Sequence, residues 1–311
     1  MNKKLTRAKI NKKDEFYTQL SDIKKELKHY KKHFNGKIIY CNTDNYKYSN
    51  FVKYFVDNFK DLKLKKIISL DLEGNYFEYD GVTKQYSKFE DGDFRGKYSI
   101  DILRGVDIVV TNPPFSLFRE HVAQLIKYDK KFLIMGNNNV ITYKKIFPLI
   151  KENKIWLGYH ANKTMEFRLP DHYDKWSRID EYGNKYGKVP AISWFTNLDF
   201  DRRYEELFLY HEYYGNEDKY PQYENYKAIN VDRVKDIPMD YSGVMGVPIT
   251  FLSKYNPKQF KLLGMAAGSS RANKLYGSVP YKPHKKDKGG NGVVNGKVKY
   301  ARLFIRAKTS V

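Results

Sequence analysis

The strongest constraint on the fold is an alternation of short apolar runs with helical patterns between residues 37 and 157. A chain that alternates strand and helix in this way is typical of an α/β protein, in which helices cover a mainly parallel sheet. The apolar runs have the length of buried strands. We predict strands at residues 37–41, 66–70, 106–110 and 131–135.

Capping and turn residues separate these strands. Ser21 is placed to cap a helix that runs to about Phe34, and Asn35-Gly36 ends it. Ser49 is placed to cap a second helix with an apolar face. The pair Asp80-Gly81, which lies between two tyrosine-containing runs, predicts a hairpin inserted before the next core strand.

The pattern weakens beyond Trp156, where short strands near residues 165–169 and 191–195 alternate with polar, tyrosine-rich stretches. The segment 264–296 is rich in glycine and carries a lysine cluster. We therefore predict a catalytic α/β domain over residues 1–160 and a less regular, basic C-terminal region over residues 161–311.

The charge balance favours a polyanionic partner. Lys and Arg number 57 against 36 Asp and Glu, which gives a net charge of +21. An excess of this size concerns association rather than fold. The alternative is an A+T-rich genome that inflates Lys, Asn and Tyr. An aromatic content of 16% excludes a disordered basic tail.

Cys41 is the one cysteine, which excludes an internal disulfide and a cysteine-based zinc cluster. We interpret it as a buried strand residue, and we interpret His29 and His33 as surface residues without a third metal ligand. No apolar run is long enough to span a membrane, and no apolar stretch follows the basic N-terminus as in a signal peptide. We expect a cytoplasmic protein, bacterial or phage-encoded and acting in the host, with no membrane partner and no metal.

The sharpest motif is Asn112-Pro113-Pro114-Phe115, which follows a strand of Val and Ile. Ligands of such sheets bind beyond the carboxyl ends of the strands. The Asn112 side-chain oxygen and the Pro113 carbonyl can accept both hydrogens of a planar amino group, while Phe115 stacks on its ring. Two such acceptors stabilise the amino nitrogen more in the transition state of methyl transfer, where it gains positive charge, than in the ground state. The alternative is an ordinary strand that ends in proline and an Asn turn.

A methyl donor such as S-adenosylmethionine needs acids for its ammonium and ribose, and amides near its carboxylate. Asp44 follows the first strand, and Ser49-Asn50-Phe51 opens the next helix, whose N-terminus favours an anion. Asp71 follows the second strand, where ribose-binding acids lie. Asp93 lies where a third strand should end and can accept from the cofactor adenine. Taken singly, each acid is better explained as a solvated loop residue, and no Gly-x-Gly-x-x-Gly is present.

These motifs occur together in an order that resembles the EcoRI-type adenine-specific DNA methyltransferases. The resemblance is carried by residues 14–18, 41–51, 92–95, 109–120 and 243–251, and it spans nearly the whole chain. It implies a Rossmann-like, S-adenosylmethionine-dependent domain with a C-terminal target-recognition region. It further implies methylation of the 6-amino group of adenine in double-stranded DNA.

The resemblance also implies residue roles. Residues 112–115 match the catalytic motif, Phe16, Tyr17 and Thr18 match the N-terminal cofactor motif, and Asp93-Phe94 lie in a further cofactor motif. The 41–51 segment departs from the acidic-Pro-Ala-Cys-Gly pattern of better-known amino-methyltransferases, which leaves the cofactor-binding atoms of that loop open. The adenine would leave the base stack to reach Asn112.

The C-terminal lysine cluster is a candidate phosphate-binding segment, and the alternative is a flexible solvated loop. Its residues are Arg271, Lys282, Lys285, Lys286 and Lys288. The chain is then either the modification partner of a cognate restriction endonuclease or an orphan or phage enzyme. Two other functions stay open: an amino-methyltransferase for RNA or protein glutamine, and an inactive DNA-binding relative.

Overall fold

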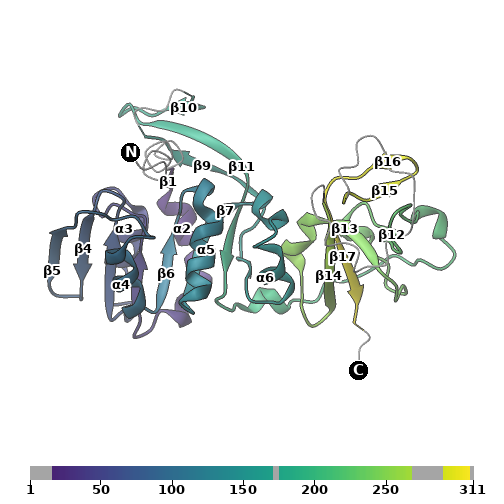
Figure 1. The fold of residues 1–311 in the computed structure, drawn as a ribbon, viewed down its shortest axis with the longest axis horizontal. Coiled ribbons are helices and arrows are strands. Elements are labelled where there is room, and N and C mark those ends of the chain that lie inside the picture. Colours follow the sequence, from purple (N-terminus) through teal and green to yellow (C-terminus); the bar gives the residue numbers. More distant parts are fainter. Residues whose placement is uncertain (1–15, 171–174, 268–289, 309–311) are drawn as a thin grey trace. The chain divides into compact units, whose positions relative to one another are not determined.

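Four buried parallel strands form the centre of the main sheet in the computed structural model, which describes residues 16–170, 175–267 and 290–308 (Figure 1). They lie in the order β7-β6-β2-β3, and all four confirm predicted strands. β6 begins two residues later than predicted because helix α4 (Lys97–Gly105) continues up to Val106. The four strands are β2 (Ile38–Cys41), β3 (Lys66–Leu70), β6 (Ile108–Thr111) and β7 (Lys131–Asn137).

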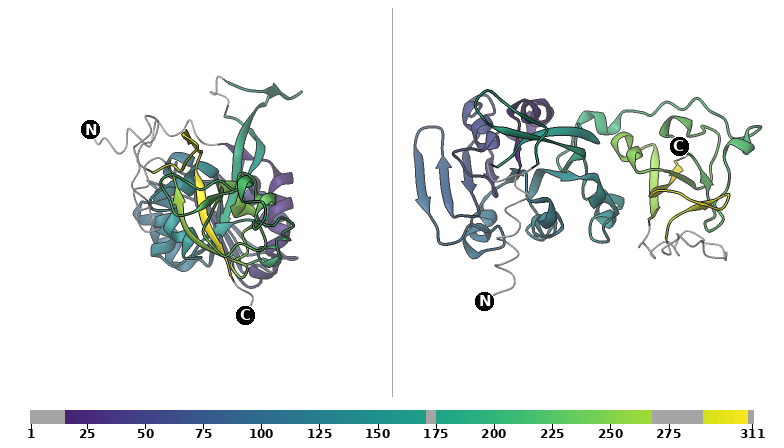
Figure 2. Two further views of the ribbon diagram at one scale, coloured as in Figure 1. Left: turned by 90° about the vertical axis from the view of Figure 1, so that its right-hand side faces the viewer. Right: turned by 90° about the horizontal axis from the view of Figure 1, so that it is seen from above.

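Helices cover both faces of this sheet (Figure 2). Successive residues of a strand point to opposite faces, so that Ile39 and Cys41 share one core with the helices of the first face. Tyr40 points to the other face, where its hydroxyl lies 2.9 Å from that of Ser99 in α4. The first face is covered by α2 (Leu20–Leu27) with the 3₁₀ helix η2 (Lys28–His33), and by α3 (Asn50–Asp57). The second face is covered by α4 and α5 (Phe118–Lys127).

The predicted helix caps have different outcomes. Ser49 caps α3 as predicted, because its Oγ accepts from the backbone N–H groups of Phe51 at 3.1 Å and Val52 at 3.3 Å. The prediction for Ser21 is wrong, because α2 begins at Leu20 and no side chain caps it. The helical segment ends before Asn35-Gly36 as predicted, and Gly36 has a φ of +71°, which glycine adopts without strain.

Antiparallel strands extend the sheet at both ends. The predicted hairpin at Asp80-Gly81 joins β4 (Asn75–Tyr79) to β5 (Lys84–Lys88), next to β3. On the other side, β7 pairs with the twelve-residue strand β11, and the complete order is β1-β9-β11-β7-β6-β2-β3-β4-β5. These strands are β1 (Tyr17–Thr18), β9 (Lys163–Arg168) and β11 (Lys185–Thr196), with β8 (Trp156–Leu157) and β10 (Arg178–Ile179) also pairing with β11.

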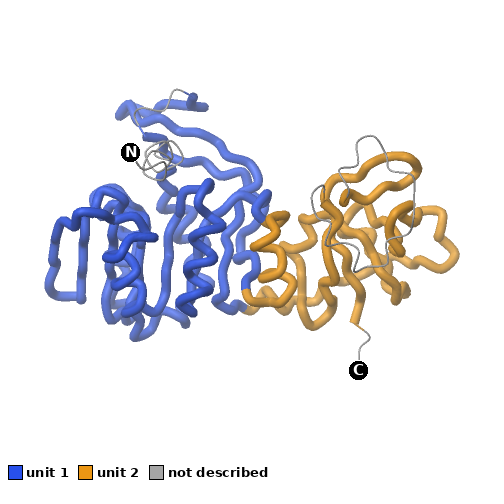
Figure 3. The backbone as a smooth tube through the Cα atoms, in the orientation of Figure 1, with its two compact units in different colours: residues 1–140, 155–200 blue, residues 141–154, 201–311 orange. Residues whose placement is uncertain are grey.

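The chain divides into two compact units, residues 1–140 with 155–200 and residues 141–154 with 201–311 (Figure 3). The expected boundary at residue 160 falls inside unit 1, because β9 and β11 pair with the main sheet. Unit 2 contains α6 (Phe147–Lys151). No helix in the described ranges has the length and apolarity that a membrane span requires.

Unit 2 is built around a small sheet in the order β12-β13-β17-β14. Gly246 and Gly292 pack against Tyr223, where a Cβ would lie 2.4 Å from the hydroxyl oxygen and from a ring carbon, respectively. The four strands of this sheet are β12 (Ile229–Asn230), β13 (Met245–Pro248), β14 (Phe260–Ala266) and β17 (Arg302–Ala307). Unit 2 also contains a separate hairpin of β15 (Val293–Val294) and β16 (Lys297–Val298). The described residues also form the 3₁₀ helices η3 (Phe115–Leu117), η4 (Asn138–Thr142), η5 (Asp201–Tyr204), η6 (Glu217–Lys219), η7 (Val234–Asp236) and η8 (Ile249–Lys254).

Candidate functional site

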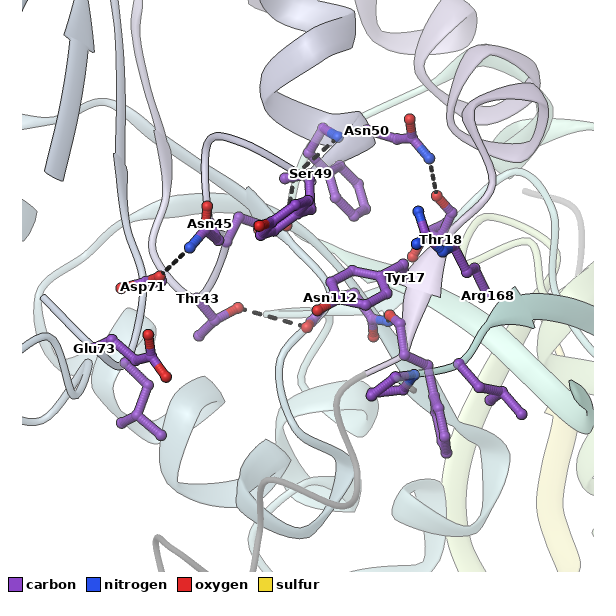
Figure 4. Close-up of a pocket in the computed structure, with 17 residues that line it drawn as sticks. Tyr17, Thr18, Thr43, Asn45, Ser49, Asn50, Asp71, Glu73, Asn112 and Arg168 are labelled. Atoms are coloured by element: carbon purple, nitrogen blue, oxygen red, sulfur yellow. Dashed lines mark hydrogen bonds between the residues drawn. The ribbon is translucent and has the colours of Figure 1, made fainter. Parts of the chain in front are cut away.

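A cavity of about 570 Å³ opens in unit 1 where β2, β3 and β6 end (Figure 4). This volume lies within the range of small-molecule sites. Segments far apart in the sequence meet there because the carboxyl ends of parallel strands share one edge of the sheet. The cavity is lined by Phe16, Tyr17, Thr18, Thr43, Asp44, Asn45, Tyr48, Ser49, Asn50, Phe51, Asp71, Leu72, Glu73, Asn112, Arg168, Leu169 and Pro170.

Asn112 lies in the wall of this cavity directly after β6. Its Nδ2 donates to the carbonyl oxygen of Phe16 at 2.8 Å. Because a carbonyl oxygen can only accept, this contact fixes which way the amide points. Its Oδ1 is buried and has no hydrogen-bond partner in the described part of the chain. An unpaired buried acceptor costs about 1–3 kcal/mol, and such groups in native proteins call for a functional explanation.

The other three residues of the Asn-Pro-Pro-Phe motif do not line the cavity. Pro113 and Pro114 are buried, and Phe115 begins η3. The Phe115 ring meets the Phe16 ring edge-on at a centroid distance of 6.1 Å. Phe16 therefore supports the motif twice, through its carbonyl and through its ring.

Asp44 connects the helix that opens the cavity to the strand that precedes Asn112. Ser49 donates to Oδ1 of Asp44 at 2.6 Å, and Thr111 donates to Oδ2 at 2.5 Å. The hydroxyl of Thr43 lies 2.5 Å from that of Thr111. Burial raises the pKa of Asp44 to about 6, although the hydrogen bonds from Ser49 and Thr111 oppose the shift. A cation beside this carboxylate would stabilise its charged form.

Asp71 is buried and organises the loop after β3. Its Oδ1 accepts from the backbone N–H of Asn75 at 2.8 Å, and its Oδ2 accepts from the side chains of Asn45 at 2.5 Å and Asn75 at 2.6 Å. These bonds use most of its accepting capacity. Glu73, which the sequence did not single out, is exposed and also lines the cavity.

The expectation that Asp93 follows a third strand is wrong. Residues 89–96 form a loop between the β4–β5 hairpin and α4, since that hairpin takes the place where the next strand was expected. Asp93 bonds to the guanidinium of Arg95 at 2.6 Å; burial alone would raise its pKa, but Arg95 lowers it. Neither Asp93 nor Phe94 lines the cavity, and Phe94 packs against the buried His121 instead.

Gly92 explains how this loop packs beside the cavity. A Cβ at Gly92 would lie 1.7 Å from the carbonyl oxygen of Asp71 and 2.8 Å from the nitrogen of Gly74. Only glycine permits this close approach of two backbones.

The remaining expectations have mixed outcomes. Cys41 is fully buried, as predicted, and burial raises the pKa of its thiol. His29 and His33 are half-buried rather than surface residues, because His29 stacks on Tyr159 and His33 lies 2.6 Å from the carbonyl oxygen of Asp199. No group of three metal-ligating side chains occurs within the described ranges. The five predicted phosphate contacts, Arg271, Lys282, Lys285, Lys286 and Lys288, lie outside the described residues.

Sequence reasoning missed the wall formed by residues 168–170. This wall exists because β9 pairs with β1, and a pairing across some 150 residues leaves no local signal. Thr43, Asn45 and Tyr48 lie within the segment that the motif order had marked, so a closer inspection of that segment would have found them.

Comparison with known proteins gives a consistent result. A family model described as adenine-specific methyltransferase EcoRI matches residues 4–90 and 77–308. The Type II methyltransferase M.EcoRI of Escherichia coli is 49% identical over 308 residues, covering 90% of this chain and 94% of the relative. M.MgeORF184P of Mycoplasma genitalium is 40% identical (96% and 97% covered), and M.MpnI of Mycoplasma pneumoniae is 37% identical (98% and 98%). No solved structure matches the chain.

Proposed function

This chain belongs to the EcoRI family of adenine-specific methyltransferases, and we propose that its cavity holds S-adenosylmethionine beside a flipped-out adenine of duplex DNA. The protein is a DNA adenine methyltransferase, in agreement with its Type II methyltransferase relatives. The observation that carries the proposed mechanism is the buried, unpartnered Oδ1 of Asn112.

The residues around the cavity fit S-adenosylmethionine. The cofactor is a cation with ribose hydroxyls and a planar adenine, and the lining offers carboxylates, amides and aromatic rings. We assign Asp44 to the ammonium, because its half-buried carboxylate lines the cavity and, with its raised pKa, gains most from a neighbouring cation. Asp71 or the neighbouring Glu73 suits the ribose hydroxyls. When bound, the cofactor supplies an electrophilic methyl group on a sulfonium.

Most of the other predicted cofactor contacts line the same cavity, whereas Asp93 and Phe94 do not. Tyr17, Thr18 and Phe51 line it, and Asn50 bonds the carbonyl of Thr18 at 2.8 Å. The N-terminus of α3 provides a favourable electrostatic environment for the cofactor carboxylate. However, Ser49 already accepts from two of its N–H groups.

Asn112 acts on the substrate amino group. Its Oδ1 accepts one amino hydrogen, and the Pro113 carbonyl accepts the other. Both bonds strengthen as the nitrogen becomes pyramidal and gains positive charge, so they stabilise the transition state more than the ground state. Because the amino group lies in the base stack of a duplex, the adenine must flip out to reach Asn112. Phe115 packs against Phe16 outside the cavity lining, so it must turn from this contact to stack on the flipped base.

The wider organisation follows the family. We propose that unit 1 is a Rossmann-like catalytic domain, since parallel strands with helices on both faces carry the cavity. Unit 2 then serves target recognition, and a cognate restriction endonuclease is the partner expected of a Type II methyltransferase. The charge of +21 fits a nucleic acid better than a protein substrate.

Incubation with tritiated S-adenosylmethionine and duplex DNA, RNA or a protein release factor tests this function. We expect label in duplex DNA, on the 6-amino group of adenine. Label in RNA or in protein glutamine instead of DNA would show that RNA or protein is the substrate. No label in any of the three would indicate an inactive relative. Single-molecule sequencing of DNA from expressing cells would then give the recognition sequence.

A further inference from the structure

Four side chains form a row across four antiparallel strands of unit 1. The register pairs Tyr17 of β1 with Arg168 of β9, Arg168 with Tyr186 of β11, and Tyr186 with Arg178 of β10. Residues directly opposite one another on antiparallel strands lie on the same face of the sheet. The row therefore alternates aromatic and cationic side chains across a single face.

The row begins at the cavity. Tyr17 and Arg168 both line it, as Figure 4 shows. Arg168 is half-buried, and in the ranges that the structure covers it has no ion-pair partner. Its positive charge is thus available to an anion at the cavity entrance.

The outer end of the row is held in place by neighbouring groups. The guanidinium of Arg178 lies over the Tyr186 ring, 3.8 Å from its centroid, and its Nη2 bonds to Glu166 at 2.7 Å. The Tyr186 hydroxyl donates to Asp180 at 3.0 Å. A guanidinium carries five N–H donors, so these contacts fix Arg178 and leave donors for a further acceptor.

The surroundings of the row are net cationic. Lys188 is exposed and lies opposite Glu166 in the register, on the same face. The row and its surroundings thus have three cations, Arg168, Arg178 and Lys188, and two carboxylates, of which Glu166 pairs with Arg178 and Asp180 accepts from Tyr186. Strands β9, β10 and β11 extend past the edge of the sheet at which β6 ends (Figure 1).

We propose that this row binds the sugar-phosphate backbone of the target strand and leads it to the cavity. The proposal rests on the proposed function, because it takes duplex DNA as the substrate. Arg168 and Arg178 are two strands apart, roughly 10 Å at sheet spacing. One strand of a duplex carries a phosphate every 3.4 Å of axis, so this span covers about three nucleotides. Arginine is the side chain best suited to phosphate oxygens, and phosphate contacts position a protein on DNA.

Tyr17 has the complementary task at the inner end of the row. An aromatic ring at the entrance offers a stacking surface to any base, whatever its sequence. If Arg168 and Arg178 bind the DNA backbone, the flipped nucleotide would pass this ring on its way to Asn112. The row thus positions the DNA strand, while other parts of the chain recognise its base sequence.

The test uses Arg168→Gln, Arg178→Gln and the double variant in the full-length protein. Binding to a mixed-sequence DNA duplex is measured by fluorescence anisotropy as a function of salt. We expect the slope of log affinity against log salt to become shallower by about 0.9 for each arginine removed. Affinity of Arg178→Gln for S-adenosylmethionine, measured by calorimetry, should stay at the wild-type value, because Arg178 does not line the cavity.

Arg104→Gln is the matched control. Arg104 is also exposed, pairs with a carboxylate (Asp101, 2.8 Å) and lies over a tyrosine ring (Tyr128, 5.8 Å), but it is on α4. Its loss should leave the salt slope unchanged. Arg168→Lys and Arg178→Lys keep the charge and should keep the slope, which separates loss of a phosphate contact from damage to the fold.

Each other result overturns the proposal. An unchanged slope in the double variant would show that the row does not touch the backbone. Weaker cofactor binding by Arg168→Gln at an unchanged slope would assign Arg168 to the cofactor carboxylate. Methyl transfer by the wild-type protein is measured in parallel. If the wild type methylates adenine in duplex DNA while the variants bind DNA like the wild type, the inference about the row fails and the proposed function stands. If the wild type modifies only RNA or protein, the proposed function fails.

Discussion

Asn112→Ala separates the chemical step from cofactor binding. The substitution removes the one buried side-chain acceptor of the cavity lining that has no partner among the described residues. Loss of a single transition-state hydrogen bond of this kind costs about 10²–10³ in rate, or roughly 3–4 kcal/mol. Affinity for S-adenosylmethionine should change little, because we assign Asn112 to the target amino group.

The effect on stability follows from the same geometry. The variant loses the bond from Nδ2 to the Phe16 carbonyl, which is worth about 1 kcal/mol. It also loses a buried unpaired acceptor, which relieves about 1–3 kcal/mol. We therefore expect Asn112→Ala to be at least as stable as the wild type, although nearly inactive.

Asn50→Ala is the matched control for this prediction. Asn50 lines the same cavity, and its Nδ2 donates to a backbone carbonyl over the same 2.8 Å, that of Thr18. Its Oδ1 is not among the buried unpartnered atoms. This variant should lose about 1 kcal/mol of stability and bind cofactor less well, while kcat falls much less.

Single-turnover transfer of tritiated methyl groups, calorimetric cofactor titration and thermal unfolding measure these three quantities. The reasoning is refuted if Asn112→Ala keeps a near-native rate. It is also refuted if Asn112→Ala loses cofactor binding first, or if it is destabilised more than Asn50→Ala.

Five further predictions concern other residues. Cofactor affinity should fall as the pH drops below about 6, where Asp44 becomes protonated, and Asp44→Asn should flatten this dependence in titrations at several pH values. Because its pKa is raised on folding, charged Asp44 costs stability above pH 6, so Asp44→Asn should raise the melting temperature at pH 7.5. Gly92→Ala should cost about 3 kcal/mol in denaturant unfolding, because its Cβ would overlap the Asp71 carbonyl. Glu26→Gln should cost about 3 kcal/mol in the same assay, because the buried Glu26 carboxylate accepts from Tyr30 and His160. If the C-terminal lysine cluster binds phosphates, the salt slope of DNA affinity should become shallower by up to about 3–4 when four residues are replaced by Ala: Lys282, Lys285, Lys286 and Lys288.

The sequence predicted the half of the site that depends on strand order. Asp44, Asp71 and Asn112 each follow a strand whose apolar run was visible, and parallel strands end at a common edge. Their meeting in one cavity therefore required only the α/β pattern. Ser49 was predictable for a similar reason, because a serine cap acts within three residues of itself.

The other half depends on pairings that no local pattern records. Asp93 was misplaced because β4 runs antiparallel to β3 and β5 antiparallel to β4, and this hairpin leads the chain to α4 without another core strand. Arg168 enters the wall through the register of β9 with β1, and a shift of one residue would turn it to the opposite face. The Phe16 carbonyl orients Asn112 through a backbone atom, which sequence identity does not reveal.

The cofactor loop and the catalytic motif are one hydrogen-bonded assembly. The first N–H groups of α3 donate to Ser49, Ser49 donates to Asp44, and Thr111 donates to the other oxygen of the same carboxylate. Thr111 is the residue before Asn112, so the carboxylate that we assign to the cofactor ammonium also positions the strand end that presents the amino-group acceptor. A cation that holds Asp44 in its charged form strengthens both bonds, because hydrogen bonds to ionised acceptors are the stronger ones. On our assignment of Asp44 to the cofactor ammonium, cofactor binding and the alignment of Asn112 are coupled through this single side chain.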